Sequence, residues 1–195
     1  MQIYDISQEV FSCAVYAGDP APEAQTLCSL SQGAVYTLSA FSMCAHNGTH
    51  IDAPAHFLRE GKTVEQIPLE SFVGPCHLLR YEGELSEAQA REILQRRAGA
   101  QRLLLAGPVT VTAEAARIFA ASDLKLLGNE GQTVGPEDAP MEVHKILLER
   151  EIVLLEGIVL TDIPEGPYFL NAAPLNLSGL EGAPCRAYLI GPLAL

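Results

Sequence analysis

The second half of the chain alternates between two hydrophobic patterns. In the first, apolar residues recur every three or four positions, which is typical of a helix with one buried face. Ser86 and Gln89 precede one such stretch in the order of a capping box, which starts a helix. In the second, short continuous apolar runs predict buried strands. Helices are expected at 86–98, 112–121 and 140–150, and strands at Arg102–Ala106, Lys125–Leu127, Ile152–Leu155, Ile158–Leu160 and Arg186–Ile190.

The first half is predicted to be rich in strands. Ile3–Ile6, Ala34–Phe41 and His77–Tyr81 are apolar or alternating runs bounded by Gly, Pro and Asp. Ala14–Pro22 holds a glycine and two prolines, so we expect a loop there. Strand–helix–strand order implies a partly parallel sheet covered by helices, and the β-rich start implies antiparallel additions. The expected fold class is therefore α/β, as a single domain over 1–195 with a mixed β-sheet flanked by helices.

Composition narrows the class of protein. With 48% apolar and 18% charged residues, the chain has an ordinary globular composition. Its net charge of −12 argues against nucleic acid as a partner, and we interpret the arginines at 91–102 as a solvated helix face. No apolar run is long enough to span a bilayer, and the N-terminus does not resemble a signal peptide. We therefore expect a cytoplasmic protein with no membrane partner, whose five widely spaced cysteines are reduced.

Three of the five histidines lie in one window, His46–His56, together with Asp52. On a helix, His46 and His50 would share a face, but the glycine and the proline inside the window argue against a helix. On an extended chain, positions 46, 50, 52 and 56 have the same parity, so their side chains would point to one side. We therefore expect an extended segment that gathers all four groups.

These groups suit a catalytic metal site. Imidazole and carboxylate are the ligands that zinc prefers, and they also suit manganese. His46, His50 and Asp52 would leave one position open for water, whose pKa a bound metal lowers towards about 7, giving metal-bound hydroxide at neutral pH. His56 would then be free to move protons as a general base and acid.

One segment rarely closes a catalytic site, so we looked for further ligands downstream. His144 lies in the expected third helix, and Glu156 directly follows the strand Ile152–Leu155. A charged residue at the end of such a strand lies near the edge of the sheet where ligands bind. Taken alone, each residue also has an ordinary structural explanation. His77 has no role that we can derive, and we treat it as structural.

With these residues identified, the sequence resembles the metal-dependent cyclase/hydrolase family, which includes bacterial kynurenine formamidases and isatin hydrolases. The window from His46 to His56 is similar to the signature of that family at seven positions. The stretch Tyr16-Ala-Gly-Asp-Pro is similar to its opening loop, and Gly182-Ala-Pro-Cys-Arg-Ala to its last strand. His144, followed one strand later by Glu156, also matches the family order.

The resemblance implies a site with up to two divalent metals, zinc or manganese. It implies a cyclase-like fold of the swivelling β/β/α type, and a homodimer or larger homo-oligomer. It also implies roles for seven side chains. The first metal would be held by His46, His50 and Asp52, the second by Asp52 and His144, and Glu156 would bridge both metals. His56 would be the proton shuttle, and Tyr16 would contact the substrate ring.

The expected activity is hydrolysis of a small amide or cyclic amide, as in kynurenine formamidase (arylformamidase). A lactone or cyclic imide hydrolase, or a cyclase, would use the same site, and a non-catalytic metal-binding domain is the alternative from another class. Two departures from the family concern the substrate. The chain has no Trp, and Asn129-Glu130 replaces a segment that often reads Gly-x-Asp.

Overall fold

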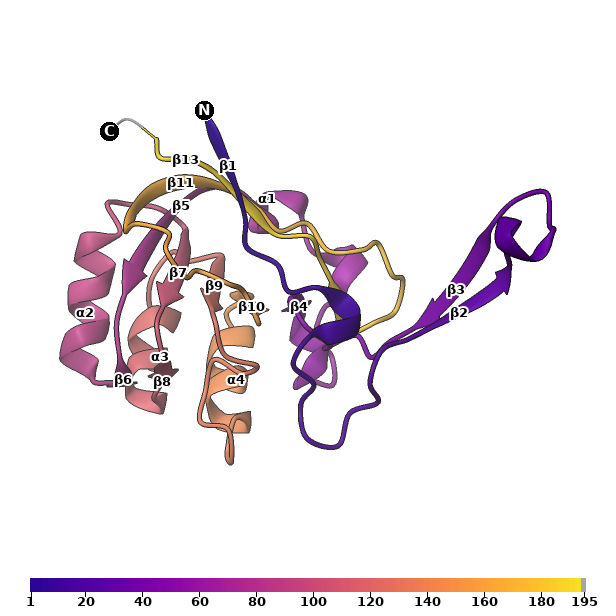
Figure 1. Ribbon diagram of the computed structural model, residues 1–195. Coiled ribbons are helices and arrows are strands. Elements are labelled where there is room, and N and C mark those ends of the chain that lie inside the picture. The colour runs from indigo at the N-terminus through magenta and orange to yellow at the C-terminus, as the bar shows by residue number, and fades with distance from the viewer. Residues whose placement is uncertain (194–195) are drawn as a thin grey trace.

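Nine strands form one curled, mixed sheet in the computed structural model, which describes residues 1–193 (Figure 1). Across the sheet the strands follow in the order β1 (Gln2–Asp5), β13 (Tyr188–Gly191), β11 (Gly166–Asn171), β5 (Val73–Arg80), β7 (Arg102–Ala106), β9 (Leu126–Asn129), β10 (Val153–Glu156), β4 (His50–Asp52) and β12 (Gly182–Pro184). The central strands β5, β7, β9 and β10 are parallel. The strands on both sides are antiparallel, so the predicted α/β class with a mixed sheet is confirmed.

Strand β7 shows why the central strands are continuous apolar runs. Leu103 and Leu105 pack into the cluster beneath the helices α2 (Glu87–Arg96), α3 (Ala113–Ala120) and α4 (Met141–Leu148), which lie along one face of the sheet (Figure 1). Leu104 and Ala106 point the other way, into an apolar interior enclosed by the curl. Because both faces are covered, every position of such a strand is buried and apolar residues are favoured throughout.

The helices begin where their capping residues predict. Ser86 accepts from the Gln89 N–H while the Gln89 side chain accepts from the Ser86 N–H, which is the predicted capping box of α2. Thr112 caps α3 in the same way through the Ala115 N–H. Pro140 immediately precedes α4. A short helix, α1 (Leu69–Phe72), leads into β5. Among the described residues, no helix is long and apolar enough to cross a membrane.

Several predicted elements differ from the structure. Ile158 and Leu160 are buried and Val159 is exposed, but the run is not a strand. Its N–H groups bond to the carbonyls of Asn129 and Ile6 and to the Glu130 carboxylate, so they form no ladder with one neighbouring strand. Ala34–Phe41 is a strand only in its second half. The predicted solvated arginine face holds for Arg91 but not for Arg97 or Arg102, whose guanidinium groups are buried against backbone carbonyls. Short strands that the pattern did not indicate include β11, β12, β6 (Gly83–Leu85) and β8 (Val109–Val111).

A two-stranded hairpin projects from the body of the protein (Figure 1). It consists of β2 (Glu23–Cys28) and β3 (Leu38–Ser42), and every residue of both strands except Cys28 is exposed. An isolated hairpin is marginally stable in water. Its exposed side chains nevertheless include the large apolar residues Leu27, Leu30, Val35, Tyr36, Leu38 and Phe41.

Candidate metal centre

The histidine-rich window forms one wall of a polar cluster, with a backbone different from the predicted one. Only His50–Asp52 is extended, as β4. His46 lies in the turn before this strand, and His56 ends a 3-10 turn that begins at Pro54. The predicted continuous extended segment is therefore wrong. The four groups still converge because the window folds back on itself, which brings the rings of His46 and His56 to 4.2 Å between centroids.

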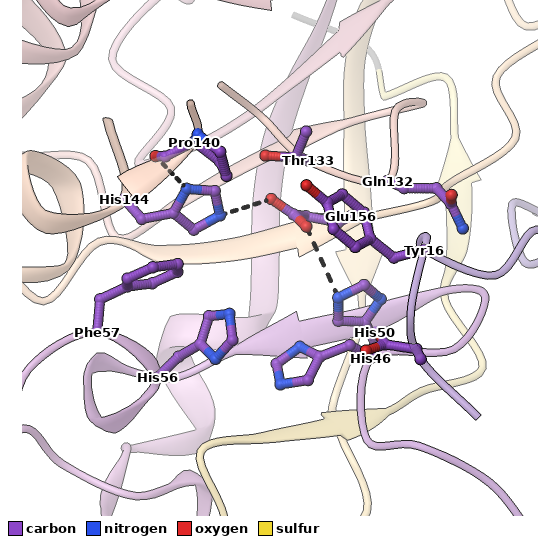
Figure 2. A pocket seen from close by; sticks show the side chains of 11 residues that line it. Tyr16, His46, His50, His56, Phe57, Gln132, Thr133, Pro140, His144 and Glu156 are labelled. Carbon is purple, nitrogen blue, oxygen red and sulfur yellow. Dashed lines mark hydrogen bonds and ion pairs between the residues drawn. The ribbon is translucent and has the colours of Figure 1, made fainter. Parts of the chain in front are cut away.

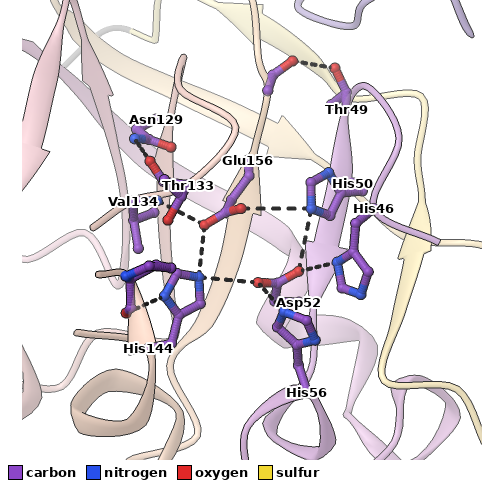
Figure 3. Close-up of polar contacts among 12 residues, drawn as sticks. His46, Thr49, His50, Asp52, His56, Asn129, Thr133, Val134, His144 and Glu156 are labelled. Carbon is purple, nitrogen blue, oxygen red and sulfur yellow. Dashed lines mark hydrogen bonds and ion pairs between the residues drawn. The ribbon is translucent and has the colours of Figure 1, made fainter. Parts of the chain in front are cut away.

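The opposite wall comes from α4 and β10. Strand β10 runs antiparallel to β4, and Glu156 at its end pairs with His50 across the ladder. The neighbouring helix α4 contributes His144. The Glu156 side chain points towards His50 of β4 (Figure 3). Residues remote in sequence thus meet at the carboxyl end of the parallel strands, which is where α/β folds place their sites.

Asp52 lies at the centre of the cluster. Its Oδ1 is 2.8 Å from His46 Nδ1 and 3.3 Å from His50 Nε2. Its Oδ2 is 3.4 Å from His144 Nε2, which is also 3.2 Å from Glu156 Oε1. Two sets of possible ligand atoms result, and in each set all atoms lie within 4.8 Å of one another. The sets are His46, His50 and Asp52, and Asp52, His144 and Glu156.

Hydrogen bonds to the backbone orient two of these imidazoles. His50 Nδ1 donates to the Gly48 carbonyl at 2.9 Å, and His144 Nδ1 donates to the Pro140 carbonyl at 2.8 Å. Each ring therefore presents an unprotonated Nε2 to the cluster when it is neutral. Such outer hydrogen bonds are how proteins select the tautomer that binds a metal.

A second layer of contacts holds the two walls together. Thr49 Oγ1 donates to the Gly157 carbonyl at 2.6 Å, and the Gln8 side chain donates to the same carbonyl at 2.8 Å. Gly157 lies so close to β4 that a Cβ there would be 2.4 Å from the Gly48 carbonyl oxygen. Its φ of +66° also favours glycine. Gly157 therefore allows the close approach that places Glu156 next to His50.

Burial and charge shift the pKa values of the whole cluster. Burial alone would lower the pKa of His50 and His144, but hydrogen bonds to Asp52 and the nearby carboxylates outweigh it and raise them to about 9 and about 10. Burial and the charge of Asp52 raise the pKa of Glu156. Burial opposes ionisation of Asp52 as well, yet its histidine hydrogen bonds hold its pKa well below the usual value.

The donor set fits divalent cations. The side chains of two carboxylates and two histidines are at most 3% exposed. Buried carboxylates are costly unless positive charge, from protonated imidazoles or from a metal ion, compensates them. Asp52 Oδ2 is buried and has no partner with hydrogen-bond geometry. Imidazole nitrogen with carboxylate oxygen is the ligand chemistry of zinc and manganese.

His56 differs from the other histidines of the site. Its side chain is 28% exposed, and its Nε2 lies 3.9 Å from Asp52 Oδ2. Burial lowers the pKa of His56 below its usual value, although the charge of Asp52 opposes the shift. The imidazole is therefore neutral at pH 7, next to the carboxylate at the centre of the cluster, and able to accept a proton.

A cleft of about 250 Å³ opens onto the cluster (Figure 2). Tyr16 forms part of its wall, and the Tyr16 hydroxyl donates to the Glu137 carbonyl at 2.8 Å, which ties the loop around Tyr16 to the segment before α4. Asn129 and Glu130 are absent from the lining. The two carboxylate oxygens of Glu130 accept hydrogen bonds from the backbone N–H groups of Gly107 and Leu160, so Glu130 stabilises the loops that contain these residues. Neither the pattern nor the resemblance indicated that Phe57 and Pro140 line the cleft.

Comparisons with known proteins find one group of similar chains. The family described as "Putative cyclase" matches residues 4–136. Kynurenine formamidase of Salinibacter ruber is 32% identical over 206 residues, which cover 97% of each chain. A solved potential metal-dependent hydrolase with cyclase activity is 28% identical, with a TM-score of 0.81 and 96% of each chain covered. Isatin hydrolase A of Labrenzia aggregata has a similar fold at 20% identity, with a TM-score of 0.82 over 96% of this chain and 93% of that one.

Proposed function

The chain belongs to the cyclase family, and from this membership we propose that it is a metal-dependent hydrolase of a small amide, with the activity of a kynurenine formamidase. Its substrate class would be an N-formyl aryl amine, whose C–N bond is not a peptide bond. The observation that carries the proposal is the buried set of ligand groups around Asp52, with the neutral His56 beside it. The catalytic unit is a single domain over residues 1–195.

We assign the metal ligands from the two sets of converging atoms. His46, His50 and Asp52 would hold one divalent metal, zinc or alternatively manganese. Asp52 and His144 would hold a second, and Glu156 would bridge both, since its two oxygens face His144 and His50 from 3.2 and 3.7 Å. When bound, the metals polarise the substrate carbonyl and lower the pKa of water.

His56 acts as the proton shuttle. Because its imidazole is neutral and lies beside the reacting centre, it takes a proton from the attacking water. It then returns this proton to the leaving nitrogen of the aryl amine. Asp52 stabilises the imidazolium that exists between the two transfers, since its carboxylate lies 3.9 Å away. Tyr16, in the cleft wall, packs against the aromatic ring of the substrate.

A substrate panel with metal control tests this function. The protein is freed of metal with a chelator, reloaded with zinc or manganese, and assayed on formanilides, lactams, cyclic imides and lactones. We expect turnover of the formanilides that disappears with the metal and returns on reloading. Turnover restricted to lactones or cyclic imides would replace the substrate class, and metal binding without any turnover would indicate a binding domain. Full activity without metal would contradict the mechanism.

We also propose that the protein is a homodimer that forms through the β2–β3 hairpin. The hairpin exposes six large apolar side chains and has no other sheet to pair with among the described residues. A symmetric partner would cover this surface in both copies at once.

We further propose a cytoplasmic location, because five free thiols suit a reducing compartment.

A further inference from the structure

One imidazole nitrogen at the metal centre is buried without a hydrogen bond. His46 directs Nδ1 towards the cluster, 2.8 Å from Asp52 Oδ1. Its other nitrogen, Nε2, is buried and has no partner of hydrogen-bond geometry. His50 and His144 each use the nitrogen that faces away from the cluster to bond a backbone carbonyl. His46 is therefore the exception, and its Nε2 requires an acceptor from another part of the fold.

Glu181 lies where such an acceptor is needed. Its Oε1 is 3.4 Å from His46 Nε2, within ion-pair distance but outside hydrogen-bond geometry. The Glu181 side chain is 41% exposed, so its outer torsions are free to adjust. Its backbone is fixed, because the Glu181 carbonyl accepts the Ala53 N–H at 2.8 Å. A small rotation of the side chain would complete the hydrogen bond without moving the backbone.

The position of the His46 ring is fixed from both sides. Gly182 follows Glu181 and pairs with Asp52 in the ladder between β12 and β4. A Cβ at Gly182 would lie 2.7 Å from His46 Cε1, so the ring lies directly against the backbone of β12. On its other side the ring stacks on His56 with an interplanar angle of 31°. Little freedom remains for the ring except the choice of which nitrogen carries the proton.

We infer that Glu181 is a positioning residue of the metal centre. Its carboxylate accepts a hydrogen bond from His46 Nε2–H and so keeps Nδ1 as the nitrogen that binds metal. A carboxylate behind a ligand histidine fixes the tautomer and raises the basicity of the coordinating nitrogen. The inference rests on the proposed function, because it presumes that His46 is a ligand.

Zinc affinity tests this role without an activity readout. Glu181→Ala removes the acceptor, Glu181→Gln keeps a neutral acceptor, and Glu84→Ala removes an exposed carboxylate from β6 as the matched control. We expect Glu181→Ala to weaken zinc binding about 10–100-fold in competition with a fluorescent chelator. Glu181→Gln should recover part of this loss, and Glu84→Ala should equal the wild type. Equal affinity of Glu181→Ala and Glu84→Ala would overturn the inference.

The tautomer of His46 gives a second readout, on the unmodified protein. In zinc-loaded protein labelled with ¹⁵N-histidine, long-range ¹H–¹⁵N correlation spectra should show His46 protonated at Nε2 and bound to zinc through Nδ1. Zinc on Nε2 would overturn the inference even if the variants failed to fold. Wild-type protein that binds no zinc would refute the proposed function as well. Wild-type protein that binds zinc and hydrolyses formanilide, with no effect of Glu181→Ala, would refute this inference alone.

Discussion

Asp52 is the residue on which both halves of the site depend. One of its oxygens faces His46 and His50, and the other faces His144 (Figure 3). Its carboxylate is fully buried, so the neighbouring histidines, or the metals they would hold, must supply its compensating charge. The two sets of ligand groups are therefore coupled through one side chain, and a change at Asp52 affects both sets.

Replacing His56 should separate catalysis from metal binding. His56 belongs to neither set of clustered ligand atoms. We expect His56→Ala to lower kcat about 10²–10⁴-fold, the usual contribution of a general base, while metal content stays at the wild-type level. Steady-state kinetics on a formanilide and elemental analysis measure the two effects. Unchanged kcat with normal metal content would show that another group moves the proton.

The metal-free protein should lose stability as the pH rises. The folded pKa values of His50 and His144, about 9 and about 10, lie above the ordinary value of 6.5. Their contribution to stability is therefore fully present below pH 6.5 and is lost as the pH rises through 9 to 10. Zinc should suppress this loss, because the metal replaces the bound protons.

Urea unfolding of chelator-treated and zinc-loaded protein between pH 6 and pH 10.5 checks this expectation. The variant His144→Gln, which cannot take up the proton, provides the control and should show a flatter dependence. A metal-free stability that is constant over this range would contradict the pKa values of the cluster.

At the scale of elements, a strand was predictable from sequence where burial of its own side chains determines its conformation, and was not predictable where pairing with another strand does. Strand β7 was predicted with its correct bounds because both of its faces are covered, so its own residues are apolar. Strand β12 is Gly-Ala-Pro, whose extended form comes from pairing with β4 and not from its own side chains. Ile158 and Leu160 fill the core from a loop, so their apolar character predicted burial correctly but did not predict strand pairing.

The part of the site that lies within one short stretch of sequence was predictable, and the part that depends on contacts between distant segments was less so. The window from His46 to His56 is local, so its spacing is visible in the sequence. His144 and Glu156 were singled out from their places on expected elements, and the family resemblance linked them to the window. Glu181 carries no such signal, because its position beside His46 depends on β12 pairing with β4, a contact between distant parts of the chain.

Gly157 should be more sensitive to substitution than other glycines of similar conformation. Gly157 and Gly179 both have φ between +60° and +85°, but a Cβ at Gly179 would meet nothing within 4 Å. Each alanine variant should lose about 1–2 kcal/mol through the left-handed backbone. Gly157→Ala should lose more and also weaken zinc binding, since it displaces the Gly48 carbonyl that orients His50. Urea unfolding and chelator competition measure both effects, and equal behaviour of the variants would refute this coupling.

At the scale of the whole molecule, the projecting hairpin is the feature that a single chain does not explain. Its strands were indicated only in part, because Glu23–Cys28 shows no apolar alternation. Its exposed apolar side chains form no part of either core cluster. Exposed apolar surface of this kind marks an interaction site.

Charged residues at the hairpin tip should therefore dissociate the dimer. Val35 and Tyr36 are 89% and 56% exposed. We expect the double variant Val35→Glu, Tyr36→Glu to sediment as a monomer, since desolvating the introduced carboxylates would oppose association. Leu69→Glu, at a leucine of α1 that is 66% exposed, is the matched control and should remain a dimer. A wild-type protein that sediments as a monomer would refute the proposed assembly.

The pairing of β1 with β13 joins the first strand of the chain to the last. During synthesis, the His46–His56 window leaves the ribosome before α4, β10 and β12 are made. At that stage it carries only some of the ligand groups of the site. Contacts between such distant segments form late and slow folding. We therefore expect nascent chains to bind metal weakly and the finished protein to be loaded after release. Cells starved of metal during synthesis should then accumulate folded apoenzyme that zinc can activate.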